Sequence, residues 1–262
     1  MLEYIVPIFQ KTCKEKSLKE RINLIDEARG VCIILVVVYH LFYSMAVVFG
    51  IEEVFNIFGI MRIYQPVLPA MFILISGISF QLSRSNIKRG LILLLISAAI
   101  TVILLIFMPK MVIWFGILHF LAVMNIGFGL IKKNIDKIPA AFGLIVFAVL
   151  FILTYNVHRG YIGIEGIWSY TLPEALYQTD CTAPLGFYTE NFRSSDYVPI
   201  LPWVFMFLIG TIIGRYANNL PPSLKKTHIR PLAFVGRHTL IIYLVHQPVI
   251  VGALYLVTGR LS

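Results

Sequence analysis

Residues 31–50 read VCIILVVVYHLFYSMAVVFG, an apolar stretch without any Asp, Glu, Lys or Arg. A helix of about 20 such residues spans the hydrocarbon core of a bilayer. Because the stretch does not alternate apolar and polar residues, a barrel strand is excluded. Comparable stretches follow at 66–83, 90–108, 112–131, 138–155, 200–217 and 237–258. They predict an all-α integral membrane protein, a compact bundle of about seven transmembrane helices.

The composition supports this fold class. The 262 residues are 58% hydrophobic and 13% charged, whereas soluble domains are roughly 45–50% apolar and about 25% charged. Three cysteines are too few for a disulfide scaffold, and we expect Cys13, Cys32 and Cys181 in different compartments, so no disulfide is predicted. The net charge of +9 could suggest nucleic acid. The cations cluster between apolar stretches, however, so we predict no nucleic-acid partner.

The 22 lysines and arginines orient the predicted bundle. All but five lie on the side of the bundle where the chain begins; the exceptions are Arg62, Lys110, Arg159, Arg193 and Arg260. By the positive-inside rule, the N-terminus is predicted to be cytoplasmic and the C-terminus outside, in a multi-pass protein of the cell membrane. We predict a cytoplasmic or interfacial segment at 1–22. A single transmembrane domain at 23–262 follows, with a long outer loop at 156–198 that suits a folded cap.

Three histidines, His40, His119 and His246, fall deep inside different predicted helices. With a helix rise of about 1.5 Å per residue, all three lie near the bilayer midplane, as does Ser76. A single buried histidine is explained equally well by a hydrogen bond to a neighbouring helix. Three at one depth favour a shared polar cavity. A metal site is a further alternative, but no Asp, Glu or Cys lies at that depth, so we predict none.

Arg29 and His40 are a more specific pair. Their spacing corresponds to about three helical turns, which places both side chains on one stripe of the first helix, about 16 Å apart. An arginine fork binds phosphate, and a histidine can act as a general base near neutral pH. A coenzyme A thioester, with phosphates at one end of a long arm, would fit this stripe. The simpler interpretation of Arg29 alone is a positive-inside flank that pairs with Asp26.

These residues resemble a known family. Residues 23–30 and the apolar run to His40 are similar to the first helix of the transmembrane acyltransferase superfamily, whose acyltransferase-3 branch has an Arg and a His separated by ten residues, as Arg29 and His40 are. Other segments resemble the branch named for heparan-α-glucosaminide N-acetyltransferase; they are residues 72–77, 115–119, 195–203 and 236–248. The animal heparan enzymes look similar in this region but have an amide residue at the position of His40. Their working histidine lies nearer the outer end of the first helix. Residues 50–64 contain no histidine here, which is a departure from those enzymes; His40 is the predicted base because its spacing from Arg29 matches the acyltransferase-3 pattern.

The resemblance implies transfer of an acetyl group from cytoplasmic acetyl-CoA to an amine or hydroxyl of an extracytoplasmic sugar or envelope glycan. We predict that His40 is the general base or, less readily, an acetyl carrier, and that His119, Ser76 or His246 polarises the thioester carbonyl. The predicted phosphate-binding residues are Arg29, Arg84, Lys88, Arg89 and Arg237. Asp196 and Tyr197 are predicted to receive the acceptor at the outer loop, although Tyr197 is also explained by a structural role at the start of the next helix.

Two other functional classes remain open. A multi-pass transporter or proton-coupled carrier would also place ionisable groups at the midplane, but the sequence has no internal repeat and no helix broken by a Gly/Pro pair. A non-catalytic membrane subunit would use its histidines only for packing. The bilayer is the one partner that follows from composition, and the sequence leaves a homo-oligomer open.

Overall fold

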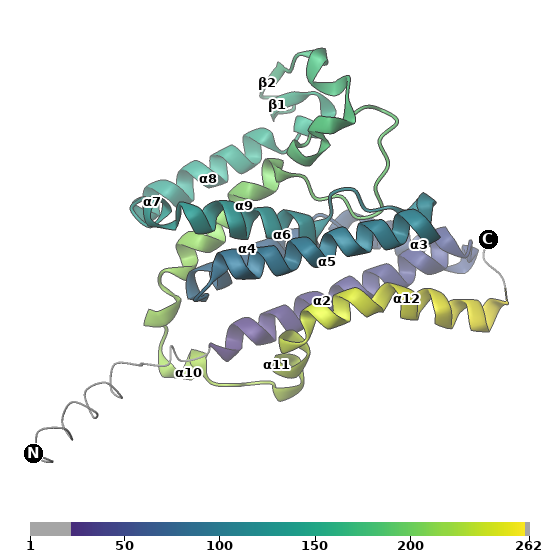
Figure 1. The fold of residues 1–262 in the computed structure, drawn as a ribbon, viewed down its shortest axis with the longest axis horizontal. Helices are drawn as coiled ribbons and strands as arrows, with labels where there is room; N and C mark the ends of the chain where they lie inside the picture. The colour runs from purple at the N-terminus through teal and green to yellow at the C-terminus, as the bar shows by residue number, and fades with distance from the viewer. Residues whose placement is uncertain (1–21, 260–262) are drawn as a thin grey trace, which may run out of the picture.

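The computed structural model describes residues 22–259, apart from the side chain of Lys110, and is mostly helical (Figure 1). The predicted segment 1–22 lies outside this range except for Ile22. Each of the seven apolar stretches contains one α-helix. These helices are α2 (Asn23–Tyr43), α4 (Val67–Leu82), α5 (Asn86–Phe107), α6 (Ile117–Leu130), α8 (Ala140–Thr154), α9 (Ile200–Gly214) and α12 (Thr239–Thr258).

Not every one of these helices has the length of a membrane span. Within residues 22–259, five helical segments are long and apolar enough to cross a membrane, or six if the bent pair Glu52–Tyr64 and Val67–Leu82 forms one span. α6 has only 14 residues, which is about 21 Å of helix against a hydrocarbon core of about 30 Å. The chain is therefore a multi-pass membrane protein by composition, while the count of seven spans and the orientation of the termini stay predictions.

The bent pair contains a helix that the sequence interpretation placed in a connection. A short 3-10 turn, Glu52–Val54, leads into α3 (Phe55–Tyr64), which meets α4 at an angle of 40°. The bend falls at Pro66, which has no backbone N–H to continue the hydrogen-bond ladder. α3 is held because Phe58 is buried and its ring lies 5.9 Å from that of Tyr39 on α2.

Two pairs of helices cross with glycine against glycine. A Cβ atom on Gly77 of α4 would collide with the carbonyl oxygen of Phe207 on α9, and one on Gly210 would collide with that of Leu74. Gly30 of α2 and Gly236 of α11 (Arg230–Arg237) exclude a Cβ in the same way. Small residues let helix backbones approach closely inside a membrane, where the hydrophobic effect does not drive association.

The helices form two groups (Figure 1). In the first group, α4, α5, α6 and α9 surround a core in which the rings of Phe80 and Phe207 lie 5.5 Å apart, edge to face, with Phe120 also fully buried, and α8 packs on α9. In the second group, α11 and α12 pack on α2. We call the end of the bundle where α2, α5 and α12 begin the basic end, and the opposite end, where residues 156–198 lie, the loop end.

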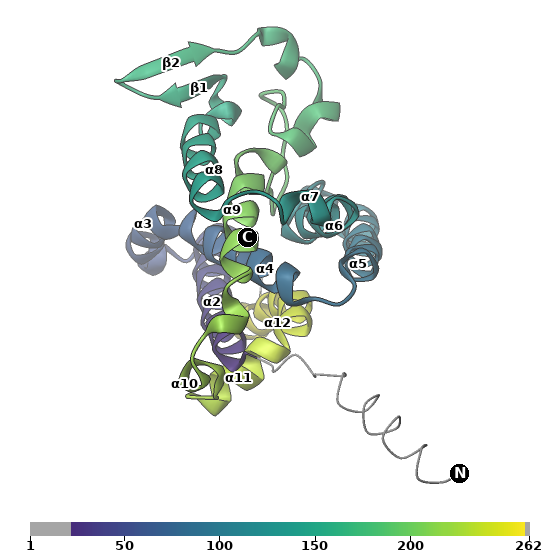
Figure 2. The same cartoon turned by 90° about the vertical axis from the view of Figure 1, so that its left-hand side faces the viewer.

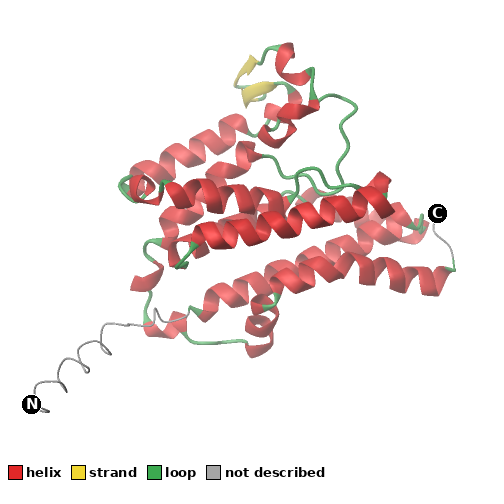
Figure 3. Cartoon of the chain, viewed as in Figure 1, coloured by secondary structure: helices red, strands yellow, loops and turns green. Residues whose placement is uncertain are grey.

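The long loop at the loop end is folded. It contains a hairpin of β1 (Tyr161–Ile164) and β2 (Trp168–Thr171), with Tyr161 opposite Thr171, followed by 3-10 turns at Glu174–Tyr177 and Asp180–Leu185 (Figures 2 and 3). The all-α prediction omitted this hairpin. Its strands are rich in β-branched and aromatic residues, and Gly166 provides the positive φ of 82° in the turn. Cys181 in this loop and Cys32 in α2 are both free.

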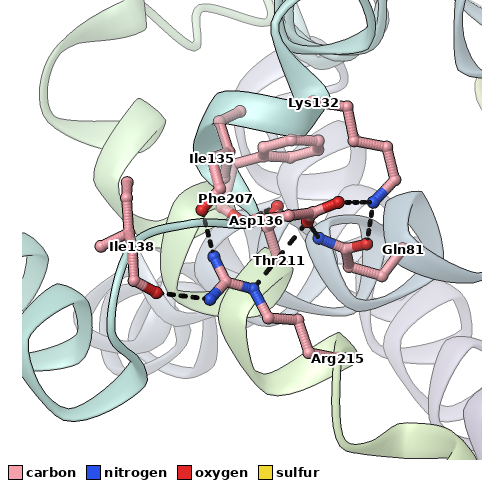
Figure 4. A network of polar contacts seen from close by, with 8 residues as sticks. All are labelled: Gln81, Lys132, Ile135, Asp136, Ile138, Phe207, Thr211 and Arg215. Carbon is pink, nitrogen blue, oxygen red and sulfur yellow. Dashed lines mark hydrogen bonds and ion pairs between the residues drawn. The ribbon is translucent and has the colours of Figure 1, made fainter.

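A polar network at the basic end joins α4, the short helix α7 (Lys132–Ile135) and the end of α9 (Figure 4). Asp136 accepts hydrogen bonds from Lys132 at 2.8 Å and from Gln81 at 2.7 Å. Arg215 donates to the carbonyl oxygens of Ile138, at 2.6 Å, and Ile135. Burial alone would raise the pKa of Asp136, but the hydrogen bonds from Lys132 and Gln81 and the nearby cations outweigh it and lower that pKa.

Candidate active site

Most of the predicted phosphate-binding residues line one cavity at the basic end. This cavity has a volume of about 400 Å³ and is lined by Arg29, Lys88, Arg89 and Arg237, with Ser76 deeper in the bundle. We call it the basic cavity. Arg84 is exposed and lines neither this cavity nor the two described below. Four cations from α2, α5 and α11 thus meet around one space, which is an arrangement that can bind a polyanion.

Asp26 fixes two of these arginines. It is buried, and its carboxylate lies 3.6 Å from Arg29 Nη1 and 3.7 Å from Arg237 Nε. Arg29 also donates a hydrogen bond to Ser79 Oγ on α4. The predicted pairing of Arg29 with Asp26 is therefore present, but it does not remove Arg29 from the cavity wall. The carboxylate orients both guanidinium groups toward the same space.

Glu27 attaches α11 to α2, and the sequence interpretation missed it. Its Oε1 accepts hydrogen bonds from the backbone N–H groups of His228, at 2.6 Å, and Ile229, at 2.9 Å. These two groups precede α11, so the carboxylate supplies acceptors for the start of that helix. Arg237 at the end of α11 is thereby placed over the basic cavity. The available signal was a second acidic residue next to Asp26 at the start of an apolar stretch. The groups that Glu27 binds lie about 200 residues away in the chain, so the sequence did not indicate them.

Two of the three deep histidines are in contact. The rings of His40 on α2 and His246 on α12 lie 4.9 Å apart. His246 Nδ1 lies 2.7 Å from the carbonyl oxygen of Tyr243 and must donate there, because a carbonyl oxygen only accepts. Within residues 22–259, no hydrogen-bond partner is found for His246 Nε2 or for His40 Nδ1. Both atoms are buried, so they can accept a proton or a hydrogen bond from a bound substrate.

His119 lies on α6, apart from the other two histidines, and both of its ring nitrogens have contacts within the protein. Its Nδ1 accepts a hydrogen bond from the N–H of Gly116 at 3.3 Å, and its Nε2 lies 3.3 Å from Thr101 Oγ1 on α5. Thr101 in turn donates to the carbonyl oxygen of Ile113 at 2.6 Å. His119 thus connects the first turn of α6 to α5, and the three histidines share a cavity without forming one cluster.

Asp196 lies among the histidines at the loop end. Its Oδ2 accepts hydrogen bonds from the hydroxyl of Tyr243, at 2.6 Å, and from the N–H of Ile117 in the first turn of α6, at 3.2 Å. A carboxylate is stabilised at this position by the helix dipole. The neighbouring Tyr197 donates to the carbonyl oxygen of Ala183 at 2.6 Å, so it fixes the fold of the loop. Burial raises the pKa of Tyr197 far above its usual value, which keeps the hydroxyl a donor.

Tyr243 is the residue around which the cavities meet, and the sequence interpretation did not name it. It lines the basic cavity and two others, which we call the middle cavity, of about 170 Å³, and the side cavity, of about 620 Å³. His40 and Asp196 line both the middle and the side cavities, and Phe72 separates the basic cavity from the middle one. The spacing of Tyr243 three residues before His246 places both on one helix face and was the available signal.

The described residues give no indication of a metal centre. Within residues 22–259 there is no group of three or more His, Cys, Asp or Glu side chains that could hold a metal ion. The absence of a metal therefore stays a prediction. The polar groups around Tyr243 are suited to acid–base chemistry, and the cations of the basic cavity to anion binding.

Comparison with known proteins identifies the family. Residues 21–248 match the family model described as heparan-alpha-glucosaminide N-acetyltransferase, catalytic. No curated protein and no solved structure matches the chain. The matched range includes every predicted site residue, from Arg29 to His246. The chain therefore belongs to the heparan-α-glucosaminide N-acetyltransferase catalytic-domain family and is a membrane acetyltransferase.

Proposed function

We propose that the protein transfers an acetyl group from acetyl-CoA, bound in the basic cavity, to an amine or hydroxyl of an extracytoplasmic sugar or envelope glycan. The observation that carries this proposal is the sequence of cavities that meet at Tyr243, with four cations at one end and His40 with Asp196 at the other. In the orientation that the positive-inside rule favours, the basic end faces the cytoplasm, where acetyl-CoA is made available.

The donor would bind through its phosphates at the basic end. Arg29 and Arg237 are already oriented by Asp26, and Lys88 and Arg89 complete the cavity wall. The pantetheine arm is long and thin, and it would run past Ser76 toward Phe72 and the middle cavity. Ser76 lines the donor side of this path, so we favour it over His119 and His246 as the group that donates to the thioester carbonyl oxygen.

His40 is the proposed general base. It would take the proton from the acceptor amine or hydroxyl as that nitrogen or oxygen attacks the thioester carbon. The tetrahedral intermediate would then collapse with breakage of the carbon–sulfur bond, and the protonated His40 would return the proton to the coenzyme A thiolate. The ring of His246 lies 4.9 Å from that of His40, and its Nε2 has no hydrogen-bond partner within residues 22–259, so it would be available to accept a proton or a hydrogen bond during transfer. Asp196 would add a negative charge that stabilises the same state.

The test is an assay in proteoliposomes with radiolabelled acetyl-CoA and an amino-sugar acceptor. We expect His40→Ala to lower kcat by at least about a hundredfold, which is a typical contribution of a general base. The matched control is His158→Ala, because His158 is an exposed histidine at the loop end that lines none of the three cavities. Full transfer by a normally folded His40→Ala protein would overturn the assignment of the base.

The same assay separates an enzyme from a carrier. Arg29→Ala should raise the KM for acetyl-CoA with little change in kcat, because its proposed contact is with the donor phosphates. Proton-driven solute uptake without consumption of acetyl-CoA would instead identify a transporter.

A further inference from the structure

The side cavity, of about 620 Å³, is larger than the basic and middle cavities and has mostly apolar walls. It lies between α5 and α12, and its volume is in the usual range of small-molecule sites. The apolar part of the wall includes Ile103 and Leu104 from α5, Met108 directly after α5, and Leu244, Val251 and Gly252 from α12.

The side cavity adjoins the lipid-facing surface. α5 packs on α6 and α12 packs on α2, but within the described chain α5 and α12 share no extended contact. Ile103 on the apolar helix α5 and Met108 directly after that helix belong to the cavity wall and are also 54% and 41% exposed. A large exposed side chain on such a helix faces lipid in a membrane. The mouth of the cavity therefore opens between two helices toward the hydrocarbon.

The inner wall of the same cavity is polar. It contains His40, His246, Asp196 and Tyr243, which are the groups of the proposed acetyl transfer. A hydrocarbon chain fits the outer, apolar wall, whereas a free oligosaccharide would have to bury hydroxyl groups there without partners, which is costly. One ligand that matches both walls has a hydrocarbon chain and a polar sugar head.

We propose that the side cavity admits a lipid-anchored acceptor from the bilayer, with its hydrocarbon chain between α5 and α12 and its sugar amine or hydroxyl at His40. The inference rests on the proposed acetyl transfer and names the class of acceptor. A chain that already lies in the bilayer gains little from an apolar protein wall. The benefit of the cavity is instead orientation of the head group at His40 and a high local concentration of acceptor.

The first test compares two acceptors in proteoliposomes: hexadecyl glucosaminide and methyl glucosaminide. We expect kcat/KM for the hexadecyl compound to be at least about tenfold higher. Partitioning into the bilayer could by itself produce that preference, so a variant must close the cavity without touching the polar groups. Gly252→Phe is chosen to narrow it, because Gly252 lines the apolar part of the cavity and an added Cβ there meets no atom within 4 Å.

Gly127→Phe is the matched control. Gly127 is also an exposed glycine inside an apolar helix, with no atom within 4 Å of an added Cβ, but it lines none of the three cavities. We expect Gly252→Phe to abolish the preference for the hexadecyl acceptor while it leaves transfer to methyl glucosaminide unchanged. Gly127→Phe should change neither. A preference that persists in Gly252→Phe, or its absence in the wild type, overturns the inference and leaves the proposed acetyl transfer intact.

A binding experiment decides the inference even if neither glucosaminide is acetylated. Hexadecyl glucosaminide with a diazirine in its chain is photo-crosslinked to the wild-type protein in vesicles. We expect labelled peptides from α5 and α12 and competition by unlabelled hexadecyl glucosaminide but not by an equal amount of phosphatidylglycerol. Labelling that phosphatidylglycerol removes equally well would show an ordinary lipid site and overturn the inference. Specific labelling of the cavity without any acetyl transfer would instead contradict the proposed function.

Discussion

The basic end of the bundle contains two groups of cations that differ in what surrounds them. Lys132 and Arg215 form one group, and their donors are directed at Asp136, Gln81 and backbone carbonyl oxygens within the protein (Figure 4). The second group lines the basic cavity and consists of Arg29, Lys88, Arg89 and Arg237. The positive-inside rule counts every cation in the same way, whichever group it belongs to. The count therefore orients the chain but does not distinguish a structural cation from a binding one.

The two groups differ in whether their side chains have hydrogen-bond partners within the protein and in whether they line a cavity. The side chain of Arg215 is only 17% exposed, so its charge must be matched by acceptors inside the protein. Within residues 22–259, no hydrogen bond or ion pair is found for the side chain of Lys88 or Arg89, and both residues line the cavity. A polyanionic ligand could therefore bind them without breaking an existing contact. The predictions below test this contrast.

The largest effect is expected for Arg215→Ala. The substitution leaves two carbonyl oxygens of the α7–α8 connection without their donor and removes a cation near Asp136. We expect a loss of about 3 kcal/mol in the free energy of unfolding, a typical cost of breaking a buried ionic network. Thermal and chemical unfolding in detergent micelles measure it. A KM for acetyl-CoA that rises without loss of stability would show that Arg215 belongs to the binding group.

A slightly smaller effect is expected for the double substitution Lys88→Ala and Arg89→Ala. A charge-assisted contact with a phosphate is worth about 1.5 kcal/mol at the lower end of its range, so loss of two such contacts should raise the KM for acetyl-CoA about a hundredfold. The unfolding temperature should stay unchanged, because neither side chain supports the fold. Steady-state kinetics and differential scanning fluorimetry provide the two readouts. A fall in kcat with an unchanged KM would contradict the assignment of Lys88 and Arg89 as residues that bind the donor.

Asp136→Asn should produce a modest, pH-dependent loss of stability. The pKa of Asp136 is lowered in the folded protein, so its stabilising contribution is present above the unfolded pKa and is lost as the pH falls through the folded pKa. Because the carboxylate is 40% exposed, the contribution at neutral pH is at most about 1 kcal/mol. The difference between the two proteins in the free energy of unfolding should begin to shrink as the pH falls below about 4 and should disappear only below the folded pKa. A constant difference at all pH values would exclude this carboxylate as the cause.

The smallest effect is expected for Arg84→Ala. Arg84 was predicted to bind phosphate with its neighbours in sequence, but it is exposed and lines none of the three cavities. The substitution should change neither the KM for acetyl-CoA nor the unfolding temperature, since isolated exposed charges contribute little. Parallel assays with the Lys88 and Arg89 variants measure this. An increase in KM equal to theirs would extend the binding group to Arg84.

The comparison also shows how far the sequence reached into the site. The positions of Arg29, Lys88, Arg89 and Arg237 near helix ends sufficed to place them on one side of the bundle. The sequence could not show that Arg89 lines the basic cavity whereas Arg84, which precedes α5, does not, because that depends on how α5 and the turn before it pack against the other helices. It also missed Tyr243, whose importance follows from its contact with Asp196, 47 residues away in the chain.

Hydropathy by itself determined the membrane class of this protein and the position of its apolar helices, because the bilayer imposes the same local requirement on every span. The tertiary structure decided which polar groups meet. Crossings at glycine residues set the distance between α2 and α11 and between α4 and α9, and the first of these crossings brings Arg29 and Arg237 to the basic cavity. Such packing depends on complementary shapes of segments far apart in the chain, which no local pattern encodes.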